Sequence, residues 1–247
     1  MEDVYCGPAP TPEQLLFAWN VDIVAIGVCM VLVVLHAATR AGGRLPLALG
    51  VGLLALLFLS PLCSLTVALF SARAVHHVLL VAVAAPLLVT AFGLHHVRSP
   101  LLSLGGLVAL GTVAMWMWHA PSLYAAGISS GPLYWVMQAS LLGSGVLFWQ
   151  AVLSLHARPG PALLALLATI VQMGMLGALL TFATRPLYAA HATTTIPFGL
   201  SPLEDQQLAG LILWVPAALP YLVAMILIVL RLQPVADGAR AQPVTGG

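Results

Sequence analysis

Seven long apolar segments constrain the fold of this chain more than any other feature. A helix needs about 20 mostly apolar residues to cross the hydrocarbon core of a membrane. The segments lie at residues 17–35, 45–65, 76–94, 101–118, 133–153, 161–180 and 208–230. Glycine and proline mark the connections between them, as is usual for loops. We therefore predict an all-α fold, a polytopic membrane bundle of seven transmembrane helices.

The composition supports a membrane protein and excludes several classes of function. Of the 247 residues, 61% are hydrophobic and only 6% are charged, whereas soluble domains carry about 25% charge. A formal charge of +1 without a basic run argues against nucleic-acid binding. All eight basic residues are arginine, so a retinal-type Schiff base, which needs a lysine amine, is excluded.

The ends of the chain flank a single predicted domain. Residues 1–16 contain acidic residues and no basic residue, so we expect an outer N-terminal tail and no cleaved signal. Residues 17–231 form the predicted seven-helix transmembrane domain. Residues 232–247 form a C-terminal tail that we expect to be disordered.

The arginines orient the predicted bundle. Six of them fall on one side of a seven-span arrangement: Arg40, Arg44, Arg98, Arg158, Arg231 and Arg240. Only Arg73 and Arg185 fall on the other side, together with most of the acidic residues. Because positive residues collect on the cytoplasmic side of a membrane, we expect the N-terminus outside and the C-terminus in the cytoplasm.

Polar side chains gather at one depth on the predicted outer side. His76 and His77 begin the third segment, His119 ends the fourth, and Asp205 lies just before the seventh. Imidazole and carboxylate at one depth suit a transition metal or a proton relay. We take His76, His77, His119 and Asp205 as candidate metal ligands.

Sulfur-containing residues lie near the same level. The thioethers of Met117 and Met137 are weaker candidate ligands, and soft sulfur favours Cu(I), although methionine also fills apolar cores. Cys63 is either a further soft ligand or a small buried hydrophobe, and a disulfide with Cys6 is a third alternative.

The connection at residues 181–207 is the longest, and loops of such length are usually functional. We expect Arg185 in it to pair with Glu204 or Asp205, closing the loop over the bundle. A wider polar and aromatic cluster accompanies these residues: Arg73, Trp116, Trp118, Arg185, Glu204, Gln206 and Gln207.

Several sequence blocks occur in a fixed order from the third segment to the seventh. They are Trp116-Met-Trp-His-Ala-Pro121 with Leu123-Tyr124, Leu147-Phe-Trp149, Leu176-Gly-Ala-Leu-Leu-Thr-Phe-Ala183, Arg185-Pro-Leu-Tyr188, and Leu200-Ser-Pro-Leu-Glu-Asp-Gln-Gln-Leu-Ala-Gly210 with Trp214-Val-Pro216. Together they resemble the seven-helix CtaG family of cytochrome c oxidase assembly factors, the kind associated with caa-type oxidases.

The resemblance implies a multi-pass protein of the bacterial inner membrane that acts at its periplasmic face. Its implied role is copper delivery to a haem–copper oxidase, or maturation of that oxidase, with a copper ion as the bound group. The implied partners are the lipid bilayer and either oxidase subunits or a periplasmic copper carrier. A homo-oligomer is a further alternative.

The chain departs from the family pattern at two histidine pairs. The family's third helix opens with two histidines four residues apart, and here the second is His77 while Arg73 replaces the first. The corresponding pair in the fifth helix falls on Tyr134 and Gln138. A guanidinium on the same helix face would repel a metal cation.

Three functions therefore stay open at this stage. The first is a copper-binding assembly factor, and the second is a metal-free structural partner of an oxidase subunit or copper carrier. The third is a transporter of copper ions or protons, with Asp22 and Gln172 on its route. No serine lies with a histidine and an acid at one level, so an enzyme is not expected.

Overall fold

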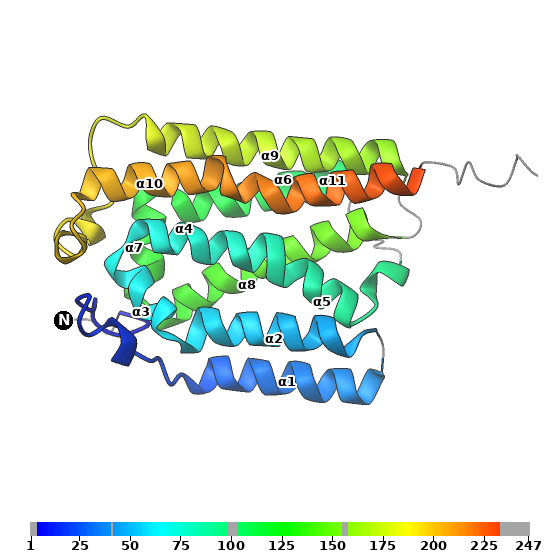
Figure 1. Cartoon of the computed structure of the whole chain (residues 1–247), viewed down its shortest axis with the longest axis horizontal. Helices are drawn as coiled ribbons and strands as arrows, with labels where there is room; N and C mark the ends of the chain where they lie inside the picture. Colours follow the sequence, from blue (N-terminus) through cyan, green and yellow to red (C-terminus); the bar gives the residue numbers. More distant parts are fainter. Residues whose placement is uncertain (1–3, 41, 98–102, 155–157, 233–247) are drawn as a thin grey trace, which may run out of the picture.

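The computed structural model describes residues 4–40, 42–97, 103–154 and 158–232. Throughout these ranges the regular structure is helical and no strand occurs, so the predicted all-α class is confirmed. The helices run side by side along one axis (Figure 1). The C-terminal tail that we expected to be disordered lies, after Leu232, outside the described residues.

The main helices follow the predicted segments in order. They are α1 (Ile23–Thr39), α2 (Arg44–Leu59), α3 (Pro61–Ala68), α4 (Phe70–Leu79), α5 (Ala85–Ala91), α6 (Leu104–His119), α7 (Pro121–Ser129), α8 (Gly131–Leu153), α9 (Pro159–Thr181), α10 (Pro202–Trp214) and α11 (Leu219–Leu232). Short turns are η1 (Leu15–Phe17), η2 (Leu80–Ala84), η3 (Leu94–His96), η4 (Ala189–His191), η5 (Ile196–Phe198) and η6 (Pro216–Ala218). The element η2 is a π-helix that joins α4 to α5.

Within the described ranges, four helical segments are long and apolar enough to cross a membrane: Phe70–Ala91, Gly131–Leu153, Pro159–Thr181 and Pro202–Leu232. The pair α2 and α3, bent by 50°, adds a fifth candidate. Two shorter apolar helices, Ile23–Thr39 and Leu104–His119, occupy the first and fourth predicted segments. The chain is a helical membrane protein.

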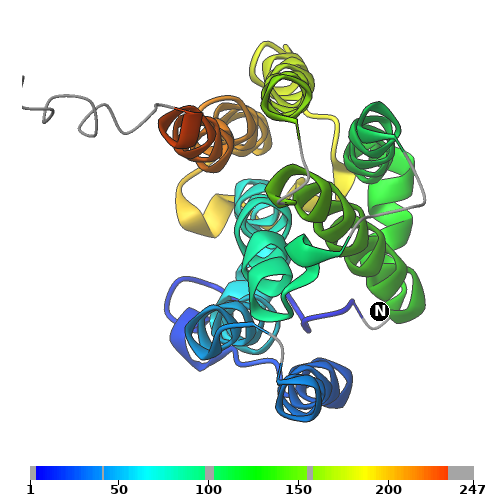
Figure 2. The ribbon, with the colours of Figure 1, turned by 90° about the vertical axis from the view of Figure 1, so that its right-hand side faces the viewer.

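The segment α4–η2–α5 lies in the middle of the bundle (Figure 2). The α1–α2 pair lies on one side of it, and α9, α10 and α11 lie on the other. Trp149 of α8 donates a hydrogen bond of 2.9 Å to the carbonyl oxygen of Val81, so side-chain contact reaches the π-helical turn itself. This central segment carries Arg73, His76 and His77.

Side-chain caps move two helix starts away from the predicted positions. The first helix begins at Ile23 instead of residue 17, because Asp22 caps it by accepting a 2.7 Å hydrogen bond from the Val24 amide. The predicted segment 208–230 begins earlier, at Pro202, where Ser201 and Glu204 form a capping box. Consequently the block from Glu204 to Gln207 lies within the first turns of a helix.

Prolines interrupt two of the predicted segments. Segment 45–65 breaks between α2 and α3 at Ser60-Pro61, where the Ser60 hydroxyl caps α3. Segment 208–230 breaks between α10 and α11 at Pro216. The helix α7 between α6 and α8 was not predicted.

Helices α9 and α10 pack backbone to backbone through two glycines. A Cβ atom added to Gly177 would lie 2.7 Å from the Gly210 carbonyl oxygen and 2.8 Å from the Trp214 amide nitrogen. One added to Gly210 would lie 2.6 Å from the Gly177 carbonyl oxygen. Small residues allow such close approach between membrane helices. This contact fixes α10, and with it the polar block, against the bundle.

We expect Gly177→Ala to lower the free energy of unfolding by about 1–3 kcal/mol, because the new methyl group collides with rigid backbone. Gly174→Ala on the same helix is the control, since its Cβ would meet the Trp214 side chain at an ordinary 3.5 Å. Thermal unfolding in detergent micelles measures both. Equal effects of the two substitutions would contradict the proposed close packing.

Candidate functional site

Three of the four polar residues that open α10, namely Glu204, Gln206 and Gln207, bind nearby backbone. Glu204 accepts a 2.8 Å hydrogen bond from the Ser201 amide. The Gln206 side-chain oxygen accepts one of 2.6 Å from the Leu187 amide, and Gln207 donates one of 3.1 Å to the Ala183 carbonyl. These contacts hold the chain between α9 and α10 in place. The polar block is thus a structural clamp for this loop.

Asp205 performs the same task for α4, which lies far away in the sequence. Its carboxylate is completely buried and accepts hydrogen bonds from the Phe70 amide (2.6 Å), the Ser71 amide (3.2 Å) and the Ser71 hydroxyl (2.5 Å). Leu69, at the N-cap position, offers no side-chain cap. A carboxylate satisfies the free amides of a helix N-terminus and complements its dipole.

The cap of Asp205 explains why the third membrane segment begins at Phe70 and not at residue 76. His76 and His77 therefore lie inside the helix, about two turns from its start, instead of opening it. Both carboxylates of the block bind backbone, so the expected ion pair of Arg185 with Glu204 or Asp205 is wrong for the described residues. Arg185 itself is exposed.

The loop at residues 182–201 closes over the ends of α3, α6 and α7. Tyr188 donates a 2.6 Å hydrogen bond to the His119 carbonyl, and Thr194 donates one of 2.7 Å to the Ala68 carbonyl. Tyr124 of α7 and His191 of the loop are joined by a 2.6 Å hydrogen bond. The loop therefore satisfies carbonyls at the ends of α3 and α6.

His191 is held as a neutral imidazole. Its Nδ1 lies 3.3 Å from the Ala68 carbonyl, which can only accept, so Nδ1 carries the proton and Nε2 accepts from Tyr124. Burial lowers the pKa of His191 to about 4. The negative charge of Asp205 acts in the opposite direction, and the positive charge of Arg73 lowers the pKa further. Burial likewise raises the pKa of Tyr124 to about 12.

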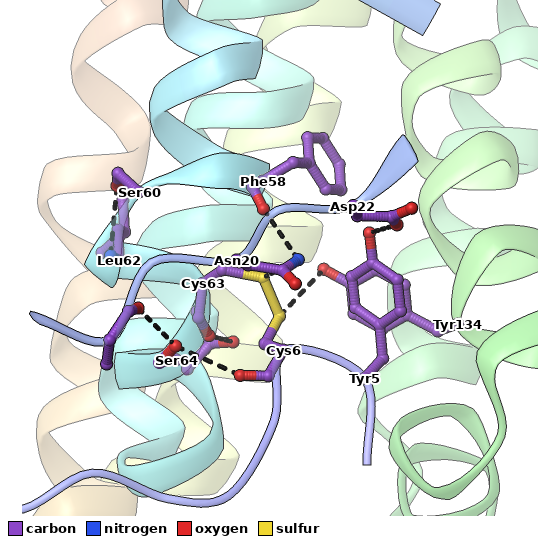
Figure 3. Close-up of a disulfide and its surroundings, with 12 residues drawn as sticks. Tyr5, Cys6, Asn20, Asp22, Phe58, Ser60, Leu62, Cys63, Ser64 and Tyr134 are labelled. Carbon is purple, nitrogen blue, oxygen red and sulfur yellow. Dashed lines mark hydrogen bonds between the residues drawn. A yellow bond between two sulfur atoms is a disulfide. The ribbon is translucent and has the colours of Figure 1, made fainter. Parts of the chain in front are cut away.

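The N-terminal segment lies at the same end of the bundle as this loop (Figure 1). A disulfide joins Cys6 to Cys63, with a Cα–Cα distance of 5.5 Å (Figure 3). Tyr5 stacks on Tyr134 at 3.8 Å between ring centroids and donates a hydrogen bond to Asp22. Of the three alternatives for Cys63, the structure therefore has the disulfide, and Cys63 is no free thiolate ligand.

Three histidines lie together beneath these covers. His76 and His77 are completely buried and His119 is 3% exposed. The ring centroids of His77 and His119 are 5.3 Å apart, and those of His76 and His77 are 5.9 Å apart. Neither ring nitrogen of His76 or His77 has a hydrogen-bond partner among the described residues, nor has Nε2 of His119. The three imidazoles thus hold unused donor and acceptor atoms in a buried place.

His119 is oriented by the backbone of its own helix. Its Nδ1 lies 2.7 Å from the Met115 carbonyl oxygen, so Nδ1 donates and the neutral ring keeps a free lone pair on Nε2. Metal-binding histidines characteristically use their second nitrogen in this way. Nε2 of His119 is therefore prepared to accept a proton or a metal ion.

A second group of buried polar side chains adjoins His76. Arg73 is completely buried, and none of its three guanidinium nitrogens has a hydrogen-bond partner among the described residues. Its Cζ lies 5.3 Å from the ring centroid of Tyr134, in a cation–π contact. Gln138 is 2% exposed, and its amide nitrogen and oxygen are also without partners in the described part of the chain.

The structure thus brings His76, His77 and His119 together, whereas the oxygens of Asp205 are used on α4. No group of three or more histidine, cysteine, aspartate or glutamate side chains suited to one metal ion occurs in the residues described. The copper ligand set therefore stays a prediction.

The two methionine candidates have different surroundings. Met117 is 37% exposed, and Met137 is buried with its sulfur beside Gly127. Trp116 and Trp118 donate hydrogen bonds to Gln172 (3.0 Å) and Ser140 (2.8 Å), which bind α6 to α9 and α8.

The sequence reasoning missed the supporting residues Ser71, Tyr124, Tyr188 and His191. Of these, Tyr124 and Tyr188 belong to sequence blocks that were noted, but no spacing indicated that their hydroxyls bind His191 and the end of α6.

We expect Asp205→Ala to lower the free energy of unfolding by about 1–3 kcal/mol, because it leaves buried amides of α4 unsatisfied. Glu204→Ala, which removes only an exposed cap, should cost less. Chemical denaturation in micelles compares the two variants. If Asp205→Ala proved no more destabilising than Glu204→Ala, the hydrogen bonds of Asp205 to α4 would not stabilise the fold as described.

We also expect stability to fall as the pH decreases from about 6.5 to about 4. In the unfolded state His191 takes up a proton near its ordinary pKa of about 6.5, whereas in the folded state it stays neutral until about pH 4. This difference lowers the free energy of unfolding by up to about 3 kcal/mol over the range. Unfolding temperatures of wild type and His191→Gln, measured across this range, test it. The variant should lose part of the decline; an unchanged decline would exclude His191 as its source.

Comparison with known proteins agrees with the resemblance read from the sequence. The profile of a family described as cytochrome c oxidase caa3 assembly factor (Caa3_CtaG) matches residues 29–233. This range includes the helices that carry Arg73, His77, His119 and Asp205. No curated protein and no solved structure gives a significant match. The chain belongs to the family of cytochrome c oxidase caa3 assembly factors.

Proposed function

We propose that this assembly factor handles copper as its cargo at the outer face of the bacterial inner membrane, for delivery to the oxidase or its maturation. The pair His77 and His119 carries the proposal. Both imidazoles are buried, and both keep nitrogens without partners among the described residues. Imidazole is a suitable ligand for copper. The role is non-enzymatic, since binding and release of an ion change no covalent bond.

The spacing of the two imidazoles fits one shared ion. With metal–nitrogen bonds of about 2 Å, two imidazoles on one ion have ring centroids up to roughly 6 Å apart. The observed separation of 5.3 Å lies within that reach. A site with only two protein ligands binds an ion weakly. Weak binding suits a protein that transfers its ion better than a protein that stores it.

Two independent features support an outer location for the site. In a seven-span bundle, six of the eight arginines fall on the side away from the histidines. By the positive-inside rule, that arginine-rich side is the cytoplasmic one. The Cys6–Cys63 disulfide lies at the same end as the histidines, since both Cys6 and Arg73, which is on the histidine-bearing helix α4, contact Tyr134. Disulfides persist in oxidising compartments such as the periplasm. The oxidase subunit or copper carrier would then approach from the periplasm.

Arg73, Tyr134 and Gln138 favour a second candidate, a metal-free partner that holds an oxidase subunit or a copper carrier. These residues stand where the resemblance places histidines, and Arg73 adds a positive charge on the face of His77. The transporter alternative has less support. Asp22 and Gln172 are engaged in a helix cap and a tryptophan contact, and the cavity at Gln172 has a volume of only about 30 Å³.

Copper binding separates these candidates. Purified protein loaded with Cu(I) should hold about one ion per chain, and the double variant His77→Ala/His119→Ala should hold nearly none. His36→Ala is the control, because His36 is also buried but lies on α1, away from the cluster. Stoichiometric copper in the double variant would exclude these ligands, and copper-free wild type would favour the metal-free partner.

Arg73→His should raise the affinity for Cu(I). It removes a positive charge one helical turn from His77, whose repulsion of the ion at the usual spacing of roughly 6 Å would be about 2.8 kcal/mol at an effective dielectric constant of about 20, and it adds an imidazole on the same helix face. We expect a gain of roughly 10- to 100-fold in competition with a Cu(I) chelator. An affinity equal to that of the wild type would show that Arg73 does not act on the ion.

A further inference from the structure

The guanidinium of Arg73 is a buried positive charge that the described residues do not neutralise. Arg73 is fully buried, its three nitrogens lack hydrogen-bond partners among those residues, and arginine cannot lose its proton. An unpaired charge in such a place costs several kcal/mol. Arg73 also lies in the first turns of α4, where the helix dipole adds further positive potential.

Two described carboxylates at this end of the bundle, Asp205 and Asp22, are already engaged. Both oxygens of Asp205 accept hydrogen bonds from Phe70 and Ser71. Asp22 accepts hydrogen bonds from the Val24 amide and the Tyr5 hydroxyl. Their charges act on Arg73 only through space, and neither carboxylate is a hydrogen-bond partner of the guanidinium.

The side chains next to Arg73 add N–H donors, and acceptor atoms as well, that have no partner among the described residues. A neutral imidazole always carries one N–H group, and His76 is buried with both nitrogens free of partners in the described part of the chain. The Gln138 amide nitrogen likewise has no hydrogen-bond partner among the described residues. His76 lies one helical turn after Arg73 on α4, Gln138 lies one turn after Tyr134 on α8, and the Arg73 guanidinium lies over the Tyr134 ring, so the three side chains form one cluster.

We propose that Arg73, His76 and Gln138 form a binding site for a small monovalent anion, either a halide or a one-carbon carboxylate. Such an ion accepts hydrogen bonds, donates none, and balances the guanidinium charge. Aromatic rings flank the cluster: the Tyr134 ring lies beside Arg73, and the ring centroid of Phe58 lies 5.0 Å from that of His76. A small ion fits between such close neighbours better than a large one.

An apolar pocket of about 150 Å³, which Phe58, Trp135 and Gln138 line, reaches the edge of this cluster. The site is distinct from the His77–His119 pair, because His119 in its neutral form presents a lone pair on Nε2 and not a proton. Anion binding and copper binding therefore depend on different side chains, and an experiment can exclude one kind of binding without excluding the other.

Binding can be measured on copper-free, full-length protein in detergent micelles with sodium gluconate as background at constant ionic strength. Chloride, bromide and formate are added in turn, and binding is followed by the unfolding temperature and by equilibrium dialysis of radioactive chloride or formate. We expect saturable binding of one anion per chain, together with a rise in unfolding temperature.

Arg73→Gln should weaken this binding at least tenfold, and Gln138→Ala should weaken it less. Arg185→Gln, which removes an exposed arginine, should leave it unchanged. Binding of formate alone would identify a carboxylate site, and binding of both ions a general anion site. Absence of saturable binding in wild type, or equal binding in a folded Arg73→Gln variant, would overturn the proposal; the wild-type result stands even if Arg73→Gln does not fold.

Discussion

The buried contact between Asp205 and the start of α4 organises the rest of the structure. A helix N-terminus presents unpaired amides and positive potential, and α4 has no capping side chain of its own. Asp205 supplies the cap from α10, and α10 is held in turn by the Gly177–Gly210 contact with α9. A charged residue in a membrane bundle is expensive, and here its full set of hydrogen bonds offsets the cost. The central helix can therefore begin at Phe70.

The early start of α4 determines where the chemistry lies. Because the helix begins before Arg73, both Arg73 and His77 fall on one buried face, with His76 between them. The N-terminal segment and the loop at residues 182–201 then cover this end, held by the disulfide and by Tyr188. Beneath them, enclosed by core residues such as Phe70, Tyr124 and Met137, lies a set of polar side chains whose donors and acceptors are largely unused among the described residues.

These polar side chains divide into two chemical groups. His77 and His119 lie together on two helices and can offer nitrogen lone pairs to a cation, whereas Arg73 carries a fixed positive charge that, with the N–H groups of His76 and Gln138, favours an anion. If the histidine pair binds copper as proposed, the fixed positive charge of Arg73 beside it would keep that binding weak, because repulsion at short range lowers affinity without removing a ligand.

The sequence was sufficient to predict the helical membrane fold, the positions of most helices and the family. It also placed His77 and His119 at a common depth, since hydrophobic length and helix direction are local properties that fix the level of helix ends. It did not predict the start of α4, because the cap comes from a residue 135 positions away. The role of Asp205 was likewise hidden, since a carboxylate before an apolar run looks the same whether it binds a metal or a distant helix. The Cys6–Cys63 disulfide stayed one of three alternatives, because spacing alone does not fix connectivity.

The most direct test of this account is caa3 oxidase activity in cells whose gene for this protein is replaced by the His77→Ala/His119→Ala variant. The account predicts that the variant accumulates in the membrane to the wild-type level while oxidase activity falls to that of the deletion strain at limiting copper. Full oxidase activity with the double variant present would contradict the claim that the buried histidine pair is the functional site.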